Sequence, residues 1–284
     1  MDIINLSCRG KYNLNKYELH KDIENSESVL YIYNNKELIK IINNKDFLNY
    51  KLYVINKLCN LKNILDLEEL VLPNSLVKHK REVIGYTMDF VKNNTNVGLI
   101  LNNNKINFID KKFILKEIAN ILKKIEDKKI LRQLNFYLGD IHEYNFIYDN
   151  KEKHLKVIDI DSSYFEGAKA PISKFLTYND KLWDFNIKYP IDNETKNYVP
   201  NKNTTVLSYI YILLNTITGE YIPNISVSEF CRILNMLNAV GINKELLDSI
   251  FNIYLPKDNF IDYELIDSIT EKQYNKFKEL QLRK

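Results

Sequence analysis

The sequence predicts an α+β protein of two lobes, a small β-rich N-terminal lobe over residues 1–91 and a larger, mainly helical lobe over residues 92–284. Short runs of β-branched and aromatic residues are concentrated in the first part, whereas apolar residues spaced three or four apart dominate the second. The length of 284 residues is enough for roughly two domains. With 45% hydrophobic and 27% charged residues, the composition is that of a globular protein.

The N-terminal part contains four segments with strand character and one with helical character. Two of the strands are joined at Asn34-Asn35, and because Asn tolerates a positive φ, this pair predicts a hairpin turn. The charged run 78–81 predicts a further break between strands. The expected strands are residues 29–33, 37–42, 70–77 and 82–91, and the expected helix is residues 46–60.

The chain after residue 91 is predicted to be mostly helical. The polar stretch 92–107 is expected to be a linker with a short helix, and Gly219 is expected to end a very apolar helix. The expected helices are residues 108–130, 204–218, 227–240, 244–253 and 263–280, and two short strands are expected at 146–148 and 155–160.

Charge and cysteine content exclude several classes of protein. Forty basic and thirty-seven acidic residues give a net charge of +3, which is too balanced to predict a nucleic-acid or membrane partner. Cys8, Cys59 and Cys231 are far apart, so they predict neither a disulfide framework nor a zinc site. No apolar run is long enough to span a membrane, and the N-terminus lacks the apolar core of a signal peptide. We therefore expect a cytoplasmic protein.

Three oxygen-bearing side chains have a spacing that points to metal-assisted chemistry. Asp140 is followed by Asn145, and Asp159 comes at the end of an apolar run. Mg²⁺ prefers oxygen ligands and is usually held by one or two carboxylates together with substrate phosphates. Asn145 and Asp159 are therefore predicted to bind the metal, and Asp140 to orient or deprotonate an acceptor hydroxyl. Asp161 is either a second ligand or a turn residue.

The run from Leu138 to Ile147, LGDIHEYNFI, resembles the catalytic loop of the protein-kinase-like superfamily, and Asp159 then resembles the first residue of its metal-binding DFG segment. The sequence of this loop is similar to the corresponding loops of RIO kinases and of aminoglycoside-phosphotransferase-type kinases. The resemblance implies a bilobal kinase-like fold, ATP as a substrate and Mg²⁺, or else Mn²⁺, as the metal.

Other segments resemble the family in the same order along the chain. Lys40, in Glu37–Ile42, resembles the strand lysine that pairs with the α- and β-phosphates. The run from Gly85 to Val91 resembles the last N-lobe strand and the hinge. In that resemblance, Met88 is the gatekeeper, and the Asp89 carbonyl and the Val91 backbone groups pair with adenine. The similarity extends over about residues 29–219.

Several residues depart from the family pattern. The sequence contains no GxGxxG motif, and the region 10–28 is the candidate location for a phosphate-covering loop of another kind. The helix after Lys40 presents Lys51 where the family has a glutamate. Leu138 replaces the usual histidine, and Asp161 replaces the DFG glycine.

The expected activity is therefore an ATP- and Mg²⁺-dependent transfer of phosphate to an alcohol group, in which Asp140 and Lys40 are catalytic. The expected nucleotide- and metal-binding residues are Lys40, Met88, Asp89, Val91, Asn145 and Asp159. A serine or threonine hydroxyl of a protein substrate is the first expectation for the acceptor. Two alternatives stay open: a pseudokinase that binds nucleotide or serves as a scaffold, and a small-molecule kinase, which His142 in the loop suggests.

Overall fold

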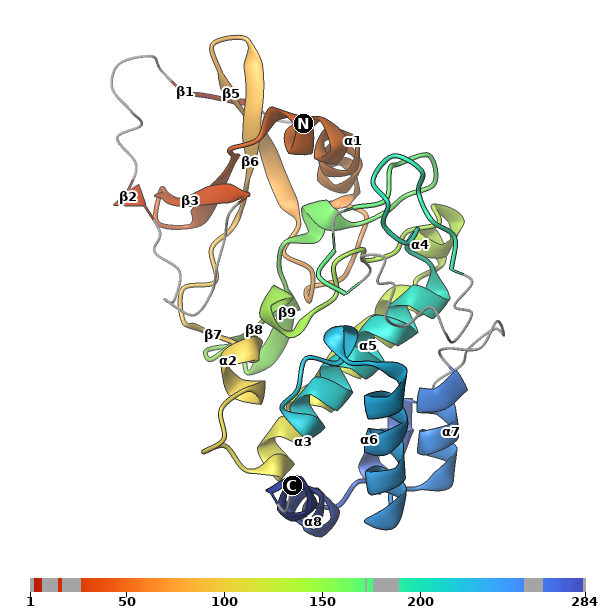
Figure 1. Cartoon of the computed structure of the whole chain (residues 1–284). Helices are drawn as coiled ribbons and strands as arrows, with labels where there is room; N and C mark the ends of the chain where they lie inside the picture. Colours follow the sequence, from red (N-terminus) through yellow and green to blue (C-terminus); the bar gives the residue numbers. More distant parts are fainter. Residues whose placement is uncertain are drawn as a thin grey trace. The chain divides into compact units, whose positions relative to one another are not determined.

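A computed structural model describes residues 3–6, 15–16, 27–171, 173–175, 189–252 and 263–282. It divides the chain into two compact units. The first unit consists of Met1–Asn94 together with Ile147–Ser163, and the second consists of Thr95–Phe146 and Tyr164–Lys284. Strands dominate the first unit and helices the second, so the predicted α+β class is confirmed (Figure 1).

The elements of the first unit are mostly strands. They are β1 (Ile3–Leu6), β2 (Asn15–Lys16), β3 (Ser28–Tyr33), β4 (Glu37–Ile42), α1 (Lys45–Leu61), β5 (Pro73–His79), β6 (Glu82–Asp89), β9 (His154–Val157) and the 3-10 turn η2 (Ile160–Ser162). The strands β7 (Asn94–Asn96) and β8 (Phe146–Asp149) contain two of the three points at which the chain passes from one unit to the other, and the third follows Ser163. Together with β9 they form a small sheet in the order β7-β8-β9.

The main sheet of the first unit has six strands in the order β1-β5-β6-β4-β3-β2. All its strand pairs are antiparallel except β1 and β5, which are parallel. Asn34 and Asn35, at φ 50° and 54°, form the turn between β3 and β4. Both residues occupy the left-handed region that a type I′ hairpin turn requires, so the predicted hairpin is confirmed.

Helix α1 covers the first unit's sheet. Its first backbone groups are capped by Asn44, whose side chain accepts a hydrogen bond from the Asp46 amide. Leu48 and Ile55 on its inner face belong to an apolar core that includes residues of β4, β5 and β6. The buried members of that core are Leu38, Ile42, Leu48, Ile55, Val71, Leu76, Tyr86 and Met88.

The segment Ile147–Ser163 belongs to the first unit because its backbone is hydrogen-bonded there. The Val71 amide donates to the Val157 carbonyl at 3.0 Å, and the Val157 amide donates to the Glu69 carbonyl at 2.7 Å. The division expected from the sequence, which assigned all of residues 92–284 to one lobe, differs from this arrangement. As a result, Asp159 and Asp161 belong to the same unit as Lys40.

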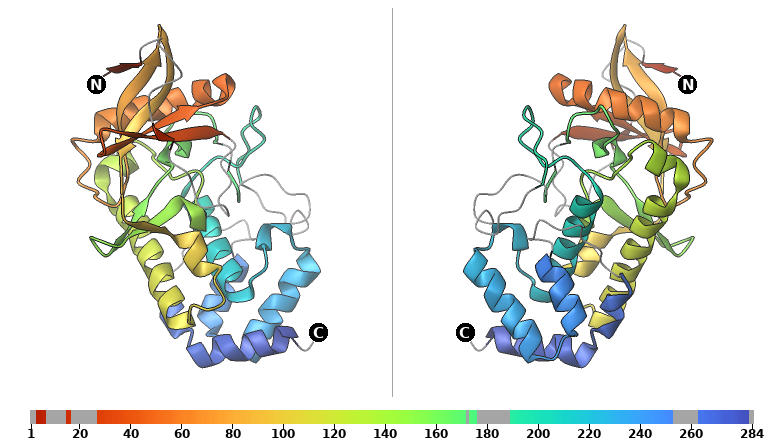
Figure 2. Two further views of the ribbon diagram at one scale, coloured as in Figure 1. Left: turned by 90° about the vertical axis from the view of Figure 1, so that its left-hand side faces the viewer. Right: turned by 90° about the vertical axis from the view of Figure 1, so that its right-hand side faces the viewer.

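The second unit consists mainly of helices. They are α2 (Val97–Leu101), α3 (Phe108–Asp127), α4 (Lys129–Gln133), η1 (Glu143–Asn145), α5 (Lys202–Thr218), η4 (Ile222–Asn224), α6 (Val227–Ala239), α7 (Lys244–Asn252), η5 (Tyr263–Ser268) and α8 (Glu271–Leu282). The long helices α3 and α5 pack against each other, as both views of Figure 2 show.

Most helix ends follow the sequence signals. Asn201 and Thr204 form a capping box at the start of α5, and Gly219 ends that helix at φ 74°, as predicted. The helix predicted over residues 263–280 is instead divided into η5 and α8. Thr270 starts α8, because the Gln273 amide donates to its side chain and the Gln273 side chain in turn accepts from the Thr270 amide. A capping pair of this kind ends one helical run and begins the next.

Among the residues described, no helix is both long enough and apolar enough to cross a bilayer.

Candidate functional site

Lys40 is a buried lysine in the middle of the first unit's sheet. It is located on β4, paired with Leu30 of β3 and Tyr86 of β6, and only 3% of its surface is exposed. Gly85 allows β6 to approach this point closely, because a Cβ atom there would lie 1.9 Å from the Lys40 carbonyl oxygen. A buried ammonium is costly unless it is paired with a negative charge.

Two aspartates provide that negative charge. The Lys40 ammonium forms an ion pair with the carboxylate of Asp159 and lies 3.2 Å and 3.1 Å from the two carboxylate oxygens of Asp161. Burial works to lower the pKa of Lys40, but the charges of Asp159 and Asp161 outweigh it, so the pKa is raised. Lys40 is therefore held as a cation.

The two aspartates differ in their access to solvent. The Asp159 side chain is 34% exposed, whereas the Asp161 side chain is 0% exposed. Burial opposes ionisation of Asp159, but Lys40 and then Lys51 outweigh it and hold its pKa well below the usual range. Burial raises the pKa of Asp161 to about 6, against the opposing charges of Lys40 and Lys51. Asp159 can therefore reach a ligand, whereas Asp161 is enclosed by protein.

Asp159 owes its position to an unusual backbone conformation. It follows β9 and precedes η2 with φ 59° and ψ 33°, in the left-handed region that residues other than glycine adopt rarely. Such strain is often found at functional sites. The turn directs the chain from β9 into η2, which contains Asp161.

Lys51 is a second buried lysine in contact with this group. It is on α1, is 8% exposed, and its ammonium lies 2.8 Å from a carboxylate oxygen of Glu27 and 3.5 Å from one of Asp161. Burial lowers its pKa and Asp161 raises it, with a net rise. Lys40, Lys51, Asp159, Asp161 and Glu27 are called the charge cluster below.

The predicted adenine-binding residues are at the end of β6. Met88 is buried and pairs with Leu38 of β4. The carboxylate of the exposed Asp89 accepts hydrogen bonds from Lys62 at 3.1 Å and from the side chain of Asn74 at 2.9 Å. The carbonyl of Val91 accepts from the side chain of Asn94, so it already has an internal donor.

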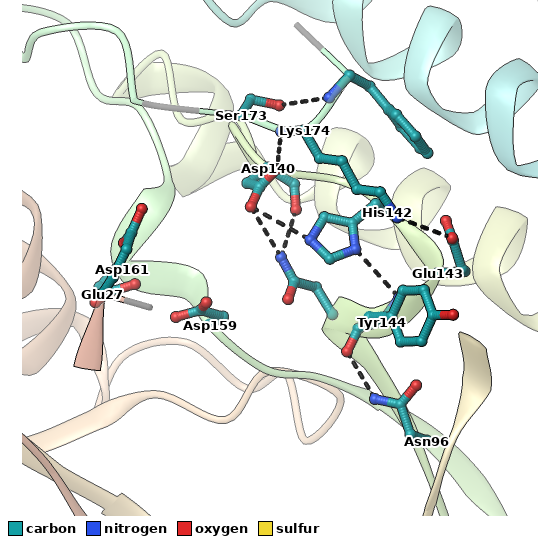
Figure 3. A network of polar contacts seen from close by, with 12 residues as sticks. Glu27, Asn96, Asp140, His142, Glu143, Tyr144, Asp159, Asp161, Ser173 and Lys174 are labelled. Carbon is teal, nitrogen blue, oxygen red and sulfur yellow. Dashed lines mark hydrogen bonds and ion pairs between the residues drawn. The ribbon is translucent and has the colours of Figure 1, made fainter. Parts of the chain in front are cut away.

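Asp140 and Asn145 lie together in the second unit. The Asn145 side-chain nitrogen donates to the Asp140 carbonyl at 2.8 Å and to its carboxylate at 3.3 Å (Figure 3). This orientation leaves the amide oxygen of Asn145 as the atom that can face a cation. The other carboxylate oxygen of Asp140 accepts from the Lys174 amide at 2.8 Å. Asp140 is therefore fixed from two directions.

His142 links this loop to its own backbone. Its Nε2 lies 3.4 Å from the Asp140 carboxylate, and its Nδ1 accepts from the Tyr144 amide at 3.2 Å, which caps η1. Asn96 donates to the Tyr144 carbonyl at 2.8 Å, and Gly98 leaves room for the Tyr144 ring, since a Cβ there would come within 2.5 Å of it. The histidine thus has the structural role of shaping the loop around Asp140.

The side chain of Lys174, whose backbone amide donates to Asp140, ends in an ammonium group that lies near one carboxylate and three aromatic rings. Its ammonium lies 3.1 Å from a carboxylate oxygen of Glu143 and 4.8 Å from the centre of the Tyr144 ring. The rings of Phe175 and Tyr221 lie 5.6 and 5.5 Å away. Burial, followed by the charges of Glu143 and Asp140, raises the pKa of Tyr221 to about 12. Glu143, Tyr144, Phe175 and Tyr221 are called the cation cage below; Figure 3 labels Glu143 and Tyr144 beside Lys174.

The structure thus brings the predicted residues together in two pairs. Lys40 and Asp159 meet in the first unit, and Asp140 and Asn145 meet in the second. Asn145 and Asp159, predicted to share a metal, belong to different units, so their common role stays a prediction. Within the described part of the chain, no group of three or more His, Cys, Asp or Glu side chains could hold a metal ion.

Sequence reasoning did not find the partners that complete each pair. It singled out Lys51 only as a residue of the wrong charge for its position, and it did not single out Glu27, Glu143 or Lys174. The one available signal was Lys51 itself, because a lysine on the apolar side of a helix requires a buried carboxylate elsewhere. The predicted phosphate-covering region, residues 10–28, lies almost entirely outside the described residues.

Comparison of the chain with models of known protein families and with curated proteins finds no match.

Proposed function

We propose that this protein is an ATP- and Mg²⁺-dependent phosphotransferase with the bilobal architecture of the protein-kinase-like superfamily. The proposal rests on one observation above all, the pairing of the buried Lys40 with Asp159 across 119 residues of sequence. Both residues were predicted from the sequence for adjacent roles, one on the phosphates and one on the metal. Two side chains so far apart in the chain meet at one point of the first unit.

Lys40 is suited to a phosphate because it stays charged and is already desolvated. A buried ammonium interacts more strongly with an anion than an exposed one does, since the surroundings screen it less. In the proposed reaction, Lys40 exchanges Asp159 for the α- and β-phosphate oxygens of ATP. Asp159 is then released to bind a cation, and its exposed side chain is accessible for that purpose.

Mg²⁺ when bound would neutralise the charge that develops on the transferred phosphoryl group. Two oxygen donors in the chain have the chemistry for it, the carboxylate of Asp159 and the amide oxygen of Asn145. The left-handed backbone at Asp159 and the hydrogen bonds from the Asn145 nitrogen to Asp140 support these assignments, because both orient an oxygen donor.

Asp140 would align the attacking hydroxyl group. Asn145 and the Lys174 amide hold its carboxylate, which is only 16% exposed. Such fixed positioning, rather than covalent chemistry, is what phosphoryl transfer requires of the protein. The backbone of Asp89 and the amide of Val91 are proposed to pair with adenine beside Met88.

The first candidate for the acceptor is a protein serine or threonine. The cation cage favours a second candidate, a small molecule with an amine near its hydroxyl. Lys174 shows the preference of that position for an ammonium, and the buried Glu143 has a second carboxylate oxygen with no hydrogen-bond partner among the described residues. A pseudokinase is the third candidate, supported by the absent glycine motif.

The test is phosphate transfer from γ-labelled ATP with Mg²⁺ or Mn²⁺. Transfer to a protein in host extract supports a protein kinase, and transfer to an amino alcohol supports a small-molecule kinase. We expect Asp159→Asn to lower the rate at least a hundredfold, whereas Asp46→Asn, an exposed carboxylate on α1, leaves it unchanged. Equal rates for wild type and Asp159→Asn would contradict the proposal.

Nucleotide binding without transfer is the outcome that identifies a pseudokinase. A ligand present at a hundredfold excess over its dissociation constant stabilises the folded state by about 2.7 kcal/mol. Thermal unfolding with ATP and Mg²⁺ therefore detects binding independently of turnover. A shift in the midpoint together with no labelled product in any acceptor assay would replace the kinase by the pseudokinase. If neither a shift in the midpoint nor a labelled product is found, both the kinase and the nucleotide-binding pseudokinase are contradicted.

A further inference from the structure

We infer that Asp161 is the positioning residue that holds Lys40 in place for the nucleotide, and that Lys51 on α1 holds Asp161 in turn. This inference rests on the proposed function and adds to it a role for Asp161, which the sequence analysis left open between a second ligand and a turn residue. The family that the chain resembles uses a glutamate on this helix to hold the strand lysine. Here the charges are reversed, with the carboxylate after β9 and the lysine on the helix.

Lys40 needs two negative partners at different stages of the proposed reaction. In the proposed reaction, Asp159 leaves Lys40 to bind the metal, and the phosphates take its place. A lysine side chain has four flexible bonds, so it needs another contact to keep its direction while partners exchange. Asp161, with both oxygens within 3.2 Å of the Lys40 ammonium, is that contact.

The two aspartates of the charge cluster differ in how far solvent reaches them. The Asp159 side chain is about one-third exposed, so solvent, a metal or a phosphate can approach it. Asp161 is fully enclosed, which makes it unsuited to a metal that must enter and leave with a nucleotide. The two carboxylates are therefore assigned different tasks, metal binding to Asp159 and lysine positioning to Asp161.

Asp161 is itself held by a second ammonium group, that of Lys51. The Lys51 ammonium lies 3.5 Å from one Asp161 oxygen and 2.8 Å from a carboxylate oxygen of Glu27, the residue before β3. The buried carboxylate of Asp161 lies between two ammonium groups, which compensate its charge. Without Lys51 it would have Lys40 alone, which it shares with Asp159, and its charge would be less well compensated. Lys51 therefore links α1 and the segment before β3 to Lys40 through Asp161.

This arrangement also explains why a lysine occupies the helix position. A glutamate at residue 51 would be placed beside Asp161 and Glu27, with Lys40 as the one ammonium of the charge cluster. Like charges at such distances repel strongly in a buried site. Asp161 and Lys51 thus depend on each other, and a change in one requires a change in the other.

The experiment measures Mg²⁺·ATP affinity by calorimetry, together with KM and kcat, for variants of the full chain. Asp161→Asn keeps the shape of the side chain and removes its charge, and we expect at least a tenfold loss of ATP affinity. Lys51→Met is expected to weaken affinity by a smaller factor. Lys45→Met is the matched control on the same helix, since Lys45 is exposed and its ion pair among the described residues is with the exposed Glu82, and it should leave affinity unchanged.

A rescue separates positioning from a merely structural role. The triple variant Glu27→Gln/Lys51→Glu/Asp161→Asn moves the carboxylate to the helix and removes the charge of Glu27 that would repel it, so Lys40 again has a charged partner besides Asp159. We expect it to recover most of the ATP affinity that Asp161→Asn loses. If Asp161→Asn does not fold, Lys51→Met and the triple variant still give the result, with thermal unfolding measured for each.

The outcomes distinguish the two proposals. A wild-type protein that binds no Mg²⁺·ATP contradicts the proposed function itself. A wild type that binds, alongside a folded Asp161→Asn variant of equal affinity, overturns the positioning role alone. Failure of the triple variant to exceed a folded Asp161→Asn variant, or to bind Mg²⁺·ATP at all where Asp161→Asn does not fold, overturns it as well. A loss of affinity that the carboxylate on α1 restores supports it.

Discussion

At the scale of single residues, the charge cluster is costly for the fold. Taking the ammonium groups of Lys40 and Lys51 and the carboxylate of Asp161 out of water costs several kcal/mol for each ion, and the attraction within the cluster often does no more than offset this cost. Apolar residues of similar size would stabilise the same space at least as well. Lys40, Lys51, Asp159 and Asp161 are therefore better explained by the binding of a charged ligand than by stability.

Gly85 is the residue whose replacement should disturb Lys40 most directly without changing any charge. A Cβ atom at residue 85 would lie 1.9 Å from the Lys40 carbonyl oxygen, and backbone cannot move aside as a flexible side chain can. We expect Gly85→Ala to lower the free energy of unfolding by about 3 kcal/mol or more, because β4 and β6 must separate. Urea unfolding measures this loss.

The control for Gly85→Ala is Glu82→Ala on the same strand. Glu82 is exposed and pairs with Lys45 at the surface, where an ion pair contributes about 0–1 kcal/mol. A Gly85→Ala protein with the urea midpoint of Glu82→Ala would show that the two strands do not approach as closely as described.

The sequence was sufficient to predict those site residues that lie close together along the chain. Asp140, Asn145 and Asp159 lie within 20 positions of one another, and their spacing alone pointed to metal chemistry. The partnership of Lys51 with Asp161 spans 110 residues and leaves no spacing to recognise. Such a pair could be inferred only from the fold, because it depends on how α1 packs beside η2.

At the scale of elements, features that depend on neighbouring residues were likewise predicted, whereas those that join distant residues were not. The hairpin of β3 and β4 and the end of α5 at Gly219 follow from local backbone preferences, and both were predicted. The parallel pairing of β1 with β5 was not, since it joins residues 3–6 to residues 76–79. Strand β5 begins at Pro73, three residues after the start of the predicted strand 70–77, and a proline is tolerated as the first residue of a strand.

The hairpin turn offers a prediction at this scale. Asn35 has a φ of 54°, and the favoured pair for a type I′ turn is Asn-Gly. We expect Asn35→Gly to raise the free energy of unfolding by a few tenths of a kcal/mol, and Asn35→Ala to lower it by about 1 kcal/mol, because alanine is strained at positive φ. Chemical denaturation compares them.

The exposed neighbour Lys36 provides the reference for the turn, since Lys36→Ala should stay within about 0.5 kcal/mol of wild type. An Asn35→Ala variant as stable as Lys36→Ala would mean that the turn does not hold residue 35 in the left-handed conformation.

At the scale of the whole molecule, the path of the chain determines which residues can act together. The chain leaves the first unit after Asn94, returns at Ile147 and leaves again after Ser163. The returning segment contains both aspartates of the charge cluster, so it supplies the two carboxylates that pair with Lys40 and one of the two that pair with Lys51. The loop with Asp140 and Asn145 immediately precedes this segment, in the second unit.

The proposed function requires that Asn145 and Asp159, from different units, act on one cation, and a double-mutant cycle tests this requirement. Substitutions at distant, independent sites add within about 0.5 kcal/mol, whereas two ligands of one ion are coupled by about 1 kcal/mol or more. The measurement is the Mn²⁺ affinity of the ATP complex for wild type, Asn145→Ala, Asp159→Ala and the double variant. Because the second substitution removes a ligand from an ion already weakly held, we expect the double variant to lose less affinity than the sum of the single losses. The parallel cycle of Asn145→Ala with Asp46→Asn should be additive, and additivity in both cycles would mean that Asn145 and Asp159 serve separate purposes.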